Sequence, residues 1–113
     1  MPRTIRLWQR DIHNLAKEKG WWETERNIPE VLCLIHSEIS EALEEYRTEK
    51  NITATDYILQ DNGKPVGFAV ELADAIIRIL DLAESLNIDI EHIIALKHDY
   101  NKTRNYRHGG KNA

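Results

Sequence analysis

Two pairs of acidic residues recur at a spacing that could bring carboxylates together. Glu38 and Glu41 lie three residues apart, and Glu71 and Asp74 repeat the interval further along the chain. Residues three apart on a helix share one face, so each pair would present two carboxylates side by side. If the pairs converge, their mutual repulsion requires a cation. Carboxylate oxygens suit Mg²⁺ or Mn²⁺, and such metals, with open positions for water, suit phosphoryl chemistry.

Solvated helix faces are the alternative explanation of both pairs, because glutamate-rich helices are common. The second pair is more informative, since it belongs to the one polar stripe of an otherwise apolar segment: Glu71, Asp74, Arg78 and Asp81. A di-iron carboxylate bundle is a further alternative, but such a site requires Glu-x-x-His pairs. The third residue after each glutamate is here an acid, which favours hard metals.

The C-terminal part of the chain carries positive charge. Lys97, Asn101 and Arg104 are spaced to line one face of a helix, and Arg107 and Lys111 follow in an expected flexible tail. Lysine and arginine bind phosphate, and an asparagine amide can donate to it. A basic helix end that complements the helix dipole is the alternative. Opposite a metal site, polyphosphate binding is the favoured interpretation.

Helical periodicity dominates the elements that must position these side chains. Four helices are expected, at about residues 4–19, 29–47, 68–86 and 90–104. Gly20 suits the end of the first, and Asp89 is a candidate N-cap of the last. In the second, the acidic stripe is expected to lie beside an apolar face centred on Ile35, Ile39, Ala42, Leu43 and Tyr46. The fold class is therefore all-α, a four-helix bundle-like domain completed by oligomerisation.

The interval 48–67 is expected to be a long connection between the second and third helices. Asp61-Asn62-Gly63 is a turn signal, and Lys64-Pro65 excludes a helix that continues there. Ile52 and residues 57–59 can form a short helical turn within it. Long connections in small domains are often functional, so this segment is a candidate part of a binding pocket.

The composition fits a single domain over residues 1–113, with 105–113 as its basic tail. The net charge of −4 argues against binding of duplex nucleic acid, which needs a basic surface. We find no signal-peptide pattern and no apolar run long enough to span a membrane, so no membrane partner and a cytoplasmic location are expected. Cys33 lies in an apolar run and is interpreted as a buried core thiol rather than a nucleophile.

Tryptophans are candidates for contact with a base. Trp22 follows Trp21 in the loop after Gly20, and an exposed loop indole can stack on a nucleobase. More often, such residues close the end of a helical bundle. Trp8 fits the core face of the first helix.

In combination, these elements resemble the MazG-like branch of the all-α nucleoside triphosphate pyrophosphohydrolases, which also include dimeric dUTPases and dCTP pyrophosphatases. The family motif is E-E-x-x-E, a variable gap, E-x-x-D, and a K-x-x-x-N-x-x-R-like run on the next helix. Here the corresponding segments are Ser37-Glu38-Ile39-Ser40-Glu41, Glu71-Leu72-Ala73-Asp74 and residues 97–104. Ser37 departs from the motif, because it stands where the family has the first acid.

The resemblance implies a hydrolysis of nucleoside triphosphate by water to nucleoside monophosphate and pyrophosphate. It implies Mg²⁺, which Mn²⁺ can replace, held by the catalytic residues Glu38, Glu41, Glu71 and Asp74. The metals would bridge the phosphates and lower the pKa of an attacking water. Lys97 and Arg104, with Arg107 or Lys111, would neutralise the phosphate charge, and Asn101 would donate a hydrogen bond to the phosphates. Family members generally work as homodimers or homotetramers, with sites at or near subunit contacts. The expected helix at 68–86 agrees with this, because it is apolar around most of its circumference.

Two other functions stay open. One is a non-catalytic regulatory module that binds a nucleotide or a metal, which Ser37 favours because a supporting acid is lost. The other is a helical interaction protein without a ligand, in which the acidic stripes are solvated. Stabilisation by metal separates the last from the first two, and pyrophosphate release separates the enzyme from the regulatory module.

Overall fold

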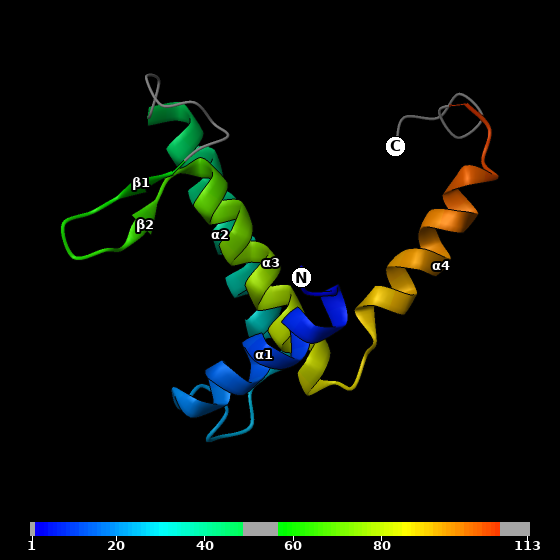
Figure 1. Ribbon diagram of the computed structural model, residues 1–113, viewed down its shortest axis with the longest axis horizontal. Helices are drawn as coiled ribbons and strands as arrows, with labels where there is room; N and C mark the ends of the chain where they lie inside the picture. The colour runs from blue at the N-terminus through cyan, green and yellow to red at the C-terminus, as the bar shows by residue number, and fades with distance from the viewer. Residues whose placement is uncertain (1, 49–56, 107–113) are drawn as a thin grey trace.

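The computed structural model describes residues 2–48 and 57–106, and helices account for most of them (Figure 1). The elements in chain order are α1 (Ile5–Glu18), α2 (Ile28–Thr48), β1 (Ile58–Leu59), β2 (Pro65–Val66), α3 (Phe68–Ser85) and α4 (Ile90–Lys102). The expected all-α class is confirmed, and the helices begin and end within two residues of the expected bounds.

Side-chain caps explain where three of the helices begin. The Thr4 hydroxyl accepts a hydrogen bond from the backbone N–H of Leu7 at the start of α1, and Asp89 accepts one from His92 at the start of α4. The Asn27 side chain does the same for Glu30 at the start of α2. Each cap satisfies a donor that has no partner within its helix.

A short hairpin replaces the helical turn that was expected near residues 57–59. Ile58 pairs with Val66 and Leu59 with Pro65, in an antiparallel register. Gly63 has a φ of 86°, a conformation that favours glycine, and its N–H donates to the carbonyl of Gln60. The expected turn at 61–63 is therefore confirmed, and it closes a hairpin that draws residues 58–59 into a strand. Ile52 lies outside the described residues.

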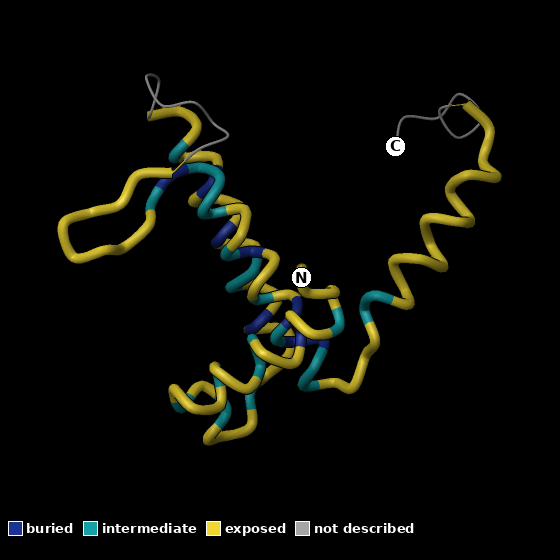
Figure 2. The backbone as a smooth tube through the Cα atoms, in the orientation of Figure 1, coloured by how far each residue is buried: buried dark blue, intermediate teal, exposed yellow. Residues whose placement is uncertain are grey.

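The core lies where α3 is enclosed by its two neighbours. α2 and α3 run antiparallel along each other, and α1 crosses the later part of α3 (Figure 1). Figure 2 shows the buried positions at these two junctions. The buried apolar residues are small or medium in size: Val31, Ala42, Ala75, Leu80, Leu82 and Ala83. Small side chains at the junctions allow the helices to approach closely.

The buried face of α2 is rotated from the expected one, of which only Ala42 is buried. α2 meets α3 through a stripe that includes Val31, Glu38 and Ala42, all of them buried. Ile39 and Leu43, expected near the centre of the buried face, are each 50% exposed. Because the acidic stripe faces α3, the neighbouring apolar stripe is turned outward in a single chain. Two related expectations are wrong in the same way, since Cys33 and Trp8 are also exposed.

α4 leaves the other helices at a junction built around one amide. The Gln9 side chain is fully buried and donates to the Glu84 carboxylate at 2.8 Å and to the Ile88 carbonyl at 2.6 Å. Its oxygen accepts from the backbone N–H of Ile90. Beyond this junction α4 projects away from α2 and α3, and its residues are exposed after the first turn (Figures 1 and 2).

None of the described helices combines the length and the apolar composition that a membrane span requires.

Candidate metal centre

Three carboxylates from two helices meet at the α2–α3 junction. Glu38 comes from α2, and Glu71 and Asp74 come from the first two turns of α3. One oxygen from each lies within 4.8 Å of the others, and we refer to these three residues as the carboxylate cluster. The antiparallel packing produces this meeting, since the acidic stripe of each helix faces the other. Glu41, one turn after Glu38, is exposed at the edge of the cluster.

The cluster fits a hard divalent cation. Mg²⁺ binds oxygen at about 2.1 Å, so two oxygens on opposite sides of one ion are about 4.2 Å apart. Neighbouring oxygens around one ion are about 3 Å apart, so the three oxygens of the cluster, which lie within 4.8 Å of one another, would draw closer by side-chain rotation when an ion binds. All three donors are carboxylate oxygens, which Mg²⁺ and Mn²⁺ prefer to softer ligands. The cluster could therefore hold a metal ion.

Glu38 stays ionised because a cation accompanies it. The Arg78 Nε donates to Glu38 Oε1 at 2.8 Å, and the Glu38 side chain is only 11% exposed. Burial raises the pKa of Glu38, but the bond to Arg78, the interactions with Glu41 and Glu71 and the arginine charge together hold it below the usual value. Glu38 is therefore the carboxylate of the cluster that holds its negative charge most firmly.

The other carboxyls hold protons more readily than usual. Burial, with the charges of Asp74, Glu41 and Glu38, raises the pKa of Glu71 to about 7. Burial and the Glu38 charge raise the pKa of Asp74, against opposing charges on Arg78 and Lys64. The interaction with Glu38 likewise raises the pKa of Glu41. These shifts are the signature of crowded carboxylates, and a bound cation would reverse them.

A cavity of about 560 Å³ opens beside the cluster. Its wall includes Glu38, Asp74 and Arg78, and aromatic rings of Trp8 and Trp21 line it further out. Two more cations, Lys19 and Arg26, belong to the same wall, and the remaining lining residues are Ile12, Leu15, Ala16, Ile77 and Asp81. Carboxylates, cations and aromatic rings thus share one cavity, which suits a ligand with charged and aromatic parts.

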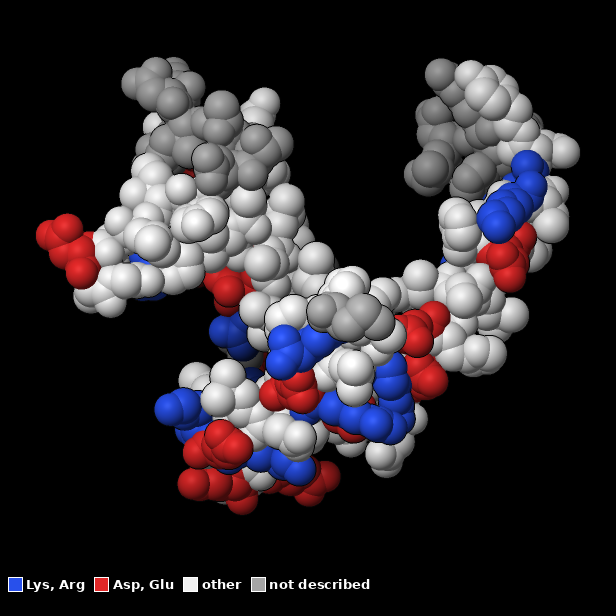
Figure 3. Space-filling model, in the orientation of Figure 1, with Lys and Arg blue, Asp and Glu red and all other residues white. Residues whose placement is uncertain are grey.

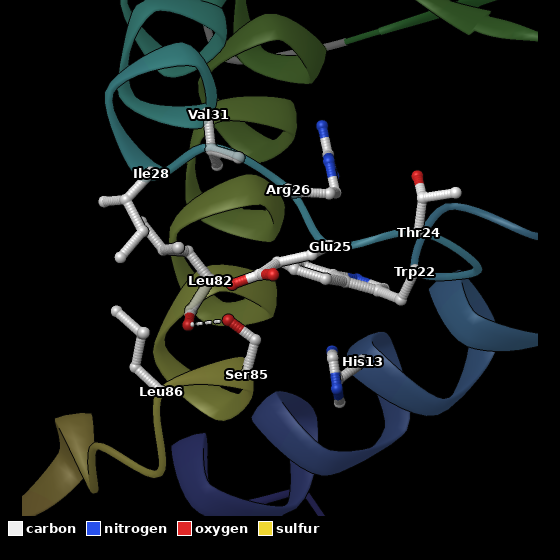
Figure 4. A pocket seen from close by; sticks show the side chains of 10 residues that line it. All are labelled: His13, Trp22, Thr24, Glu25, Arg26, Ile28, Val31, Leu82, Ser85 and Leu86. Carbon is white, nitrogen blue, oxygen red and sulfur yellow. Dashed lines mark hydrogen bonds between the residues drawn. The ribbon is translucent and has the colours of Figure 1, made fainter.

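Trp22 lines a second, smaller cavity of about 320 Å³ (Figure 4). It also takes part in a polar network. Its indole N–H donates to both oxygens of Asp81, and His13 Nδ1 lies 2.7 Å from Asp81 Oδ1. The His13 ring meets the Trp22 ring edge-on, and the Arg26 guanidinium lies 5.1 Å from its centre. Trp22 thus already has partners along its edge and over its ring, and base stacking by it stays a prediction.

The expected phosphate-binding residues of α4 do not lie beside the cluster in this chain. Lys97 and Arg104 are exposed and lie over the ring of Tyr100, 5.0 and 5.8 Å from its centre. Asn101 is also exposed. α4 points away from α2 and α3 (Figure 1), so these residues reach the cluster only if α4 belongs to another copy or moves. Arg107 and Lys111 lie outside the described residues.

The sequence interpretation assigned no role to Arg78, Asp81 or His13. Arg78 and Asp81 belong to the same polar stripe as Asp74, one and two turns further along α3. That stripe was visible in the sequence, and a single arginine among three acids could have indicated that Arg78 pairs with a carboxylate of the site. The pairing of His13 with Asp81 joins positions 68 residues apart, and no local pattern predicts it.

No protein family, no curated protein and no solved structure matched this chain when it was compared with them.

Proposed function

We propose that this protein is a Mg²⁺-dependent pyrophosphohydrolase that converts nucleoside triphosphates, or their deoxy forms, to monophosphates and pyrophosphate. The observation that carries the proposal is the carboxylate cluster, two of whose members, Glu38 and Asp74, line a cavity that also holds cations and aromatic rings. Metal-binding oxygens, phosphate-binding cations and rings that can contact a base are the three kinds of group that such a substrate needs. The motif resemblance given above supports the same reaction.

Each group of residues would have a separate task. The cluster and Glu41 would hold Mg²⁺, which when bound would activate a water and offset the phosphate charge. Trp8 and Trp21, 46% and 60% exposed, offer ring surface to a base. The cations of the cavity wall would attract and orient the triphosphate. The crowded carboxylates release their protons when the cation arrives, so binding is expected to be tighter as the pH rises.

The protein is proposed to act as a homodimer or homotetramer. Large apolar side chains on α2, α3 and α4 are exposed in the single chain, among them Leu43, Ile76 and Leu96. On the face seen in Figure 3, charged side chains gather over α1 and the loop after it, and the surface between the hairpin and α3 is mostly uncharged. A second copy that covers the apolar faces with its α4 would also bring Lys97 and Arg104 toward the cluster.

A regulatory module that binds nucleotide or metal without turnover is the second candidate. Ser37 stands where the family motif has an acid, and its hydroxyl donates to the Leu34 carbonyl of its own helix. A serine supplies no carboxylate, so position 37 lacks the supporting acid of the motif. Tight binding of nucleotide with no pyrophosphate released would favour this candidate.

The deciding experiment is a panel of NTPs and dNTPs assayed for pyrophosphate release with Mg²⁺, with Mn²⁺ and with EDTA. We expect metal-dependent release of pyrophosphate, with at least one nucleotide clearly preferred. Glu44→Gln is a matched control, because Glu44 is exposed on α2 and is not part of the cluster. It should retain full activity, and Glu38→Gln should lose it. Release of orthophosphate instead of pyrophosphate would reject the proposed reaction.

A further inference from the structure

Arg78 is the one basic residue of α3 and stands one turn after Asp74. Its Nε donates to Glu38 Oε1 at 2.8 Å, and the two side chains are 34% and 11% exposed. Within the part of the chain that the structure describes, no other lysine or arginine forms an ion pair with the cluster. Arg78 is therefore tied to the site by a direct contact rather than by general proximity.

Most of the donor capacity of Arg78 is not used by that contact. A guanidinium has five N–H donors, and the bond to Glu38 employs the one on Nε. In residues 2–48 and 57–106, neither terminal nitrogen of Arg78 has a hydrogen-bond partner. The side chain lines the same cavity as Glu38 and Asp74. Four N–H donors thus remain available at the cavity wall, next to carboxylates that could hold a metal.

The other cations of this cavity are arranged differently. The Arg26 guanidinium lies over the rings of Trp21 and Trp22, 5.8 and 5.1 Å from their centres. Lys19 is exposed at the end of α1, and it forms no ion pair with any described residue. Of the three cations that line this cavity, Arg78 is therefore the one held beside the cluster by an ion pair with a carboxylate.

We propose that Arg78 contacts the phosphate groups of the substrate through its terminal nitrogens while its Nε keeps Glu38 in place. This assignment rests on the proposed function, and it adds a substrate contact that comes from α3 of the same chain. The planar guanidinium can serve both partners at once, because its donors point in different directions in one plane. A lysine ammonium carries its three N–H donors on a single nitrogen, so it spans the carboxylate and the phosphate less well.

Binding of inorganic tripolyphosphate tests the assignment without turnover. Calorimetric titrations with saturating Mg²⁺ would compare wild type with Arg78→Gln, Arg78→Lys and Arg26→Gln. Loss of a charged hydrogen-bonding partner typically weakens binding by roughly tenfold or more, which we expect for Arg78→Gln. Arg78→Lys should recover only part of the affinity. Arg26→Gln removes a cation from the same cavity and should weaken binding clearly less than Arg78→Gln does, since Arg26 lies over the Trp21 and Trp22 rings and has no contact with the cluster.

Chemical rescue separates contact from mere structural support. Arg78→Ala should regain tripolyphosphate binding when guanidinium ion is added at millimolar levels, and an equal concentration of tetramethylammonium should not restore it. Circular dichroism would verify that each variant is folded, and Arg78→Lys supplies a conservative variant if Arg78→Ala is not. A lack of rescue in folded Arg78→Ala would overturn the assignment. Equal losses in the Arg26 and Arg78 variants would do the same.

The outcomes also separate this assignment from the proposed reaction. If wild type hydrolyses no nucleotide but binds tripolyphosphate in an Arg78-dependent way, the reaction is wrong and the Arg78 contact stands. If wild type hydrolyses nucleotides and Arg78→Gln binds tripolyphosphate as tightly as wild type, the reaction stands and the contact is wrong. Absence of tripolyphosphate binding to wild type in the presence of Mg²⁺ would also reject the contact.

Discussion

The indole N–H of Trp22 donates to both carboxylate oxygens of Asp81, at 3.0 and 3.1 Å. This bond ties the loop after α1 to the later part of α3, and the Asp81 side chain is only 14% exposed. Removing a partner of a partly buried charge costs about 1–3 kcal/mol, so Trp22→Phe should lower the free energy of unfolding by that amount. Trp21→Phe is the matched control, since Trp21 is 60% exposed. Urea denaturation that finds the two variants equally stable would contradict the structural role of the bond.

The stability of the metal-free protein should fall as the pH rises. The pKa of Glu71 is about 7 in the folded protein, against an ordinary value of 4.5. Between these two values the folded protein retains a proton that the unfolded chain has released, so Glu71 destabilises the fold increasingly up to pH 7. Melting temperatures in EDTA from pH 5 to pH 8 would measure the slope. Glu71→Gln should flatten it, and a variant with an unchanged slope would show that other groups are responsible.

Mg²⁺ should remove this penalty. Because the cation binds the ionised carboxylates of the folded protein, millimolar Mg²⁺ or Mn²⁺ should raise the melting temperature, and more so at pH 8 than at pH 5. The same titration with Glu38→Gln should show little stabilisation, because a buried ligand is lost. Glu44→Gln should respond as wild type does. A melting temperature indifferent to both metals would reject the metal centre.

Asp74→Asn should separate folding from turnover. The substitution keeps the shape of the side chain and removes one charge from the cluster. Repulsion within the cluster falls, so the metal-free protein should be as stable as wild type or more stable. Pyrophosphate release should fall by orders of magnitude, at about 1.4 kcal/mol for each tenfold. Turnover like that of wild type would show that Asp74 does not hold a catalytic metal.

Two inactive variants should restore each other if α4 acts on a second copy. Lys97→Ala combined with Arg104→Ala removes two cations proposed to contact phosphate, one on α4 and one just after it, and Asp74→Asn disables the cluster. In a mixed oligomer, one site would combine an intact cluster with an intact α4. Co-expression of the two variants should therefore recover part of the activity that each lacks. Light scattering should give a mass well above the 13.2 kDa of one chain. No recovery in a confirmed oligomer would place the phosphate contacts within one chain.

Helix positions and the meeting of the acidic stripes could be predicted because local signals govern both. Caps such as Thr4 and Asp89 fix where the helices begin, and the three-residue spacing fixes which carboxylates share a face. Once α2 and α3 pack antiparallel in the observed register, Glu38 faces Glu71 and Asp74.

The outward side of α2 and the direction of α4 could not be predicted in the same way. Ile39 and Leu43 have the periodicity of a buried face, and periodicity shows that a face is apolar but not what, if anything, packs against it. Nor does any local pattern link Gln9 to Ile88 and Ile90, which lie about eighty residues away and decide where α4 leaves the bundle.

That attachment makes α4 a lever arm. Its 13 residues rise about 1.5 Å each, so the helix is a rod of about 20 Å held near one end. A tilt of 10° about the Gln9 amide would carry the far end through about 3.5 Å, which is more than the length of a hydrogen bond. Small differences in how position 9 bonds to the α3–α4 connection are thus magnified at Lys97, Asn101 and Arg104. Gln9 therefore determines the direction in which these three residues point, although it lies at the other end of α4.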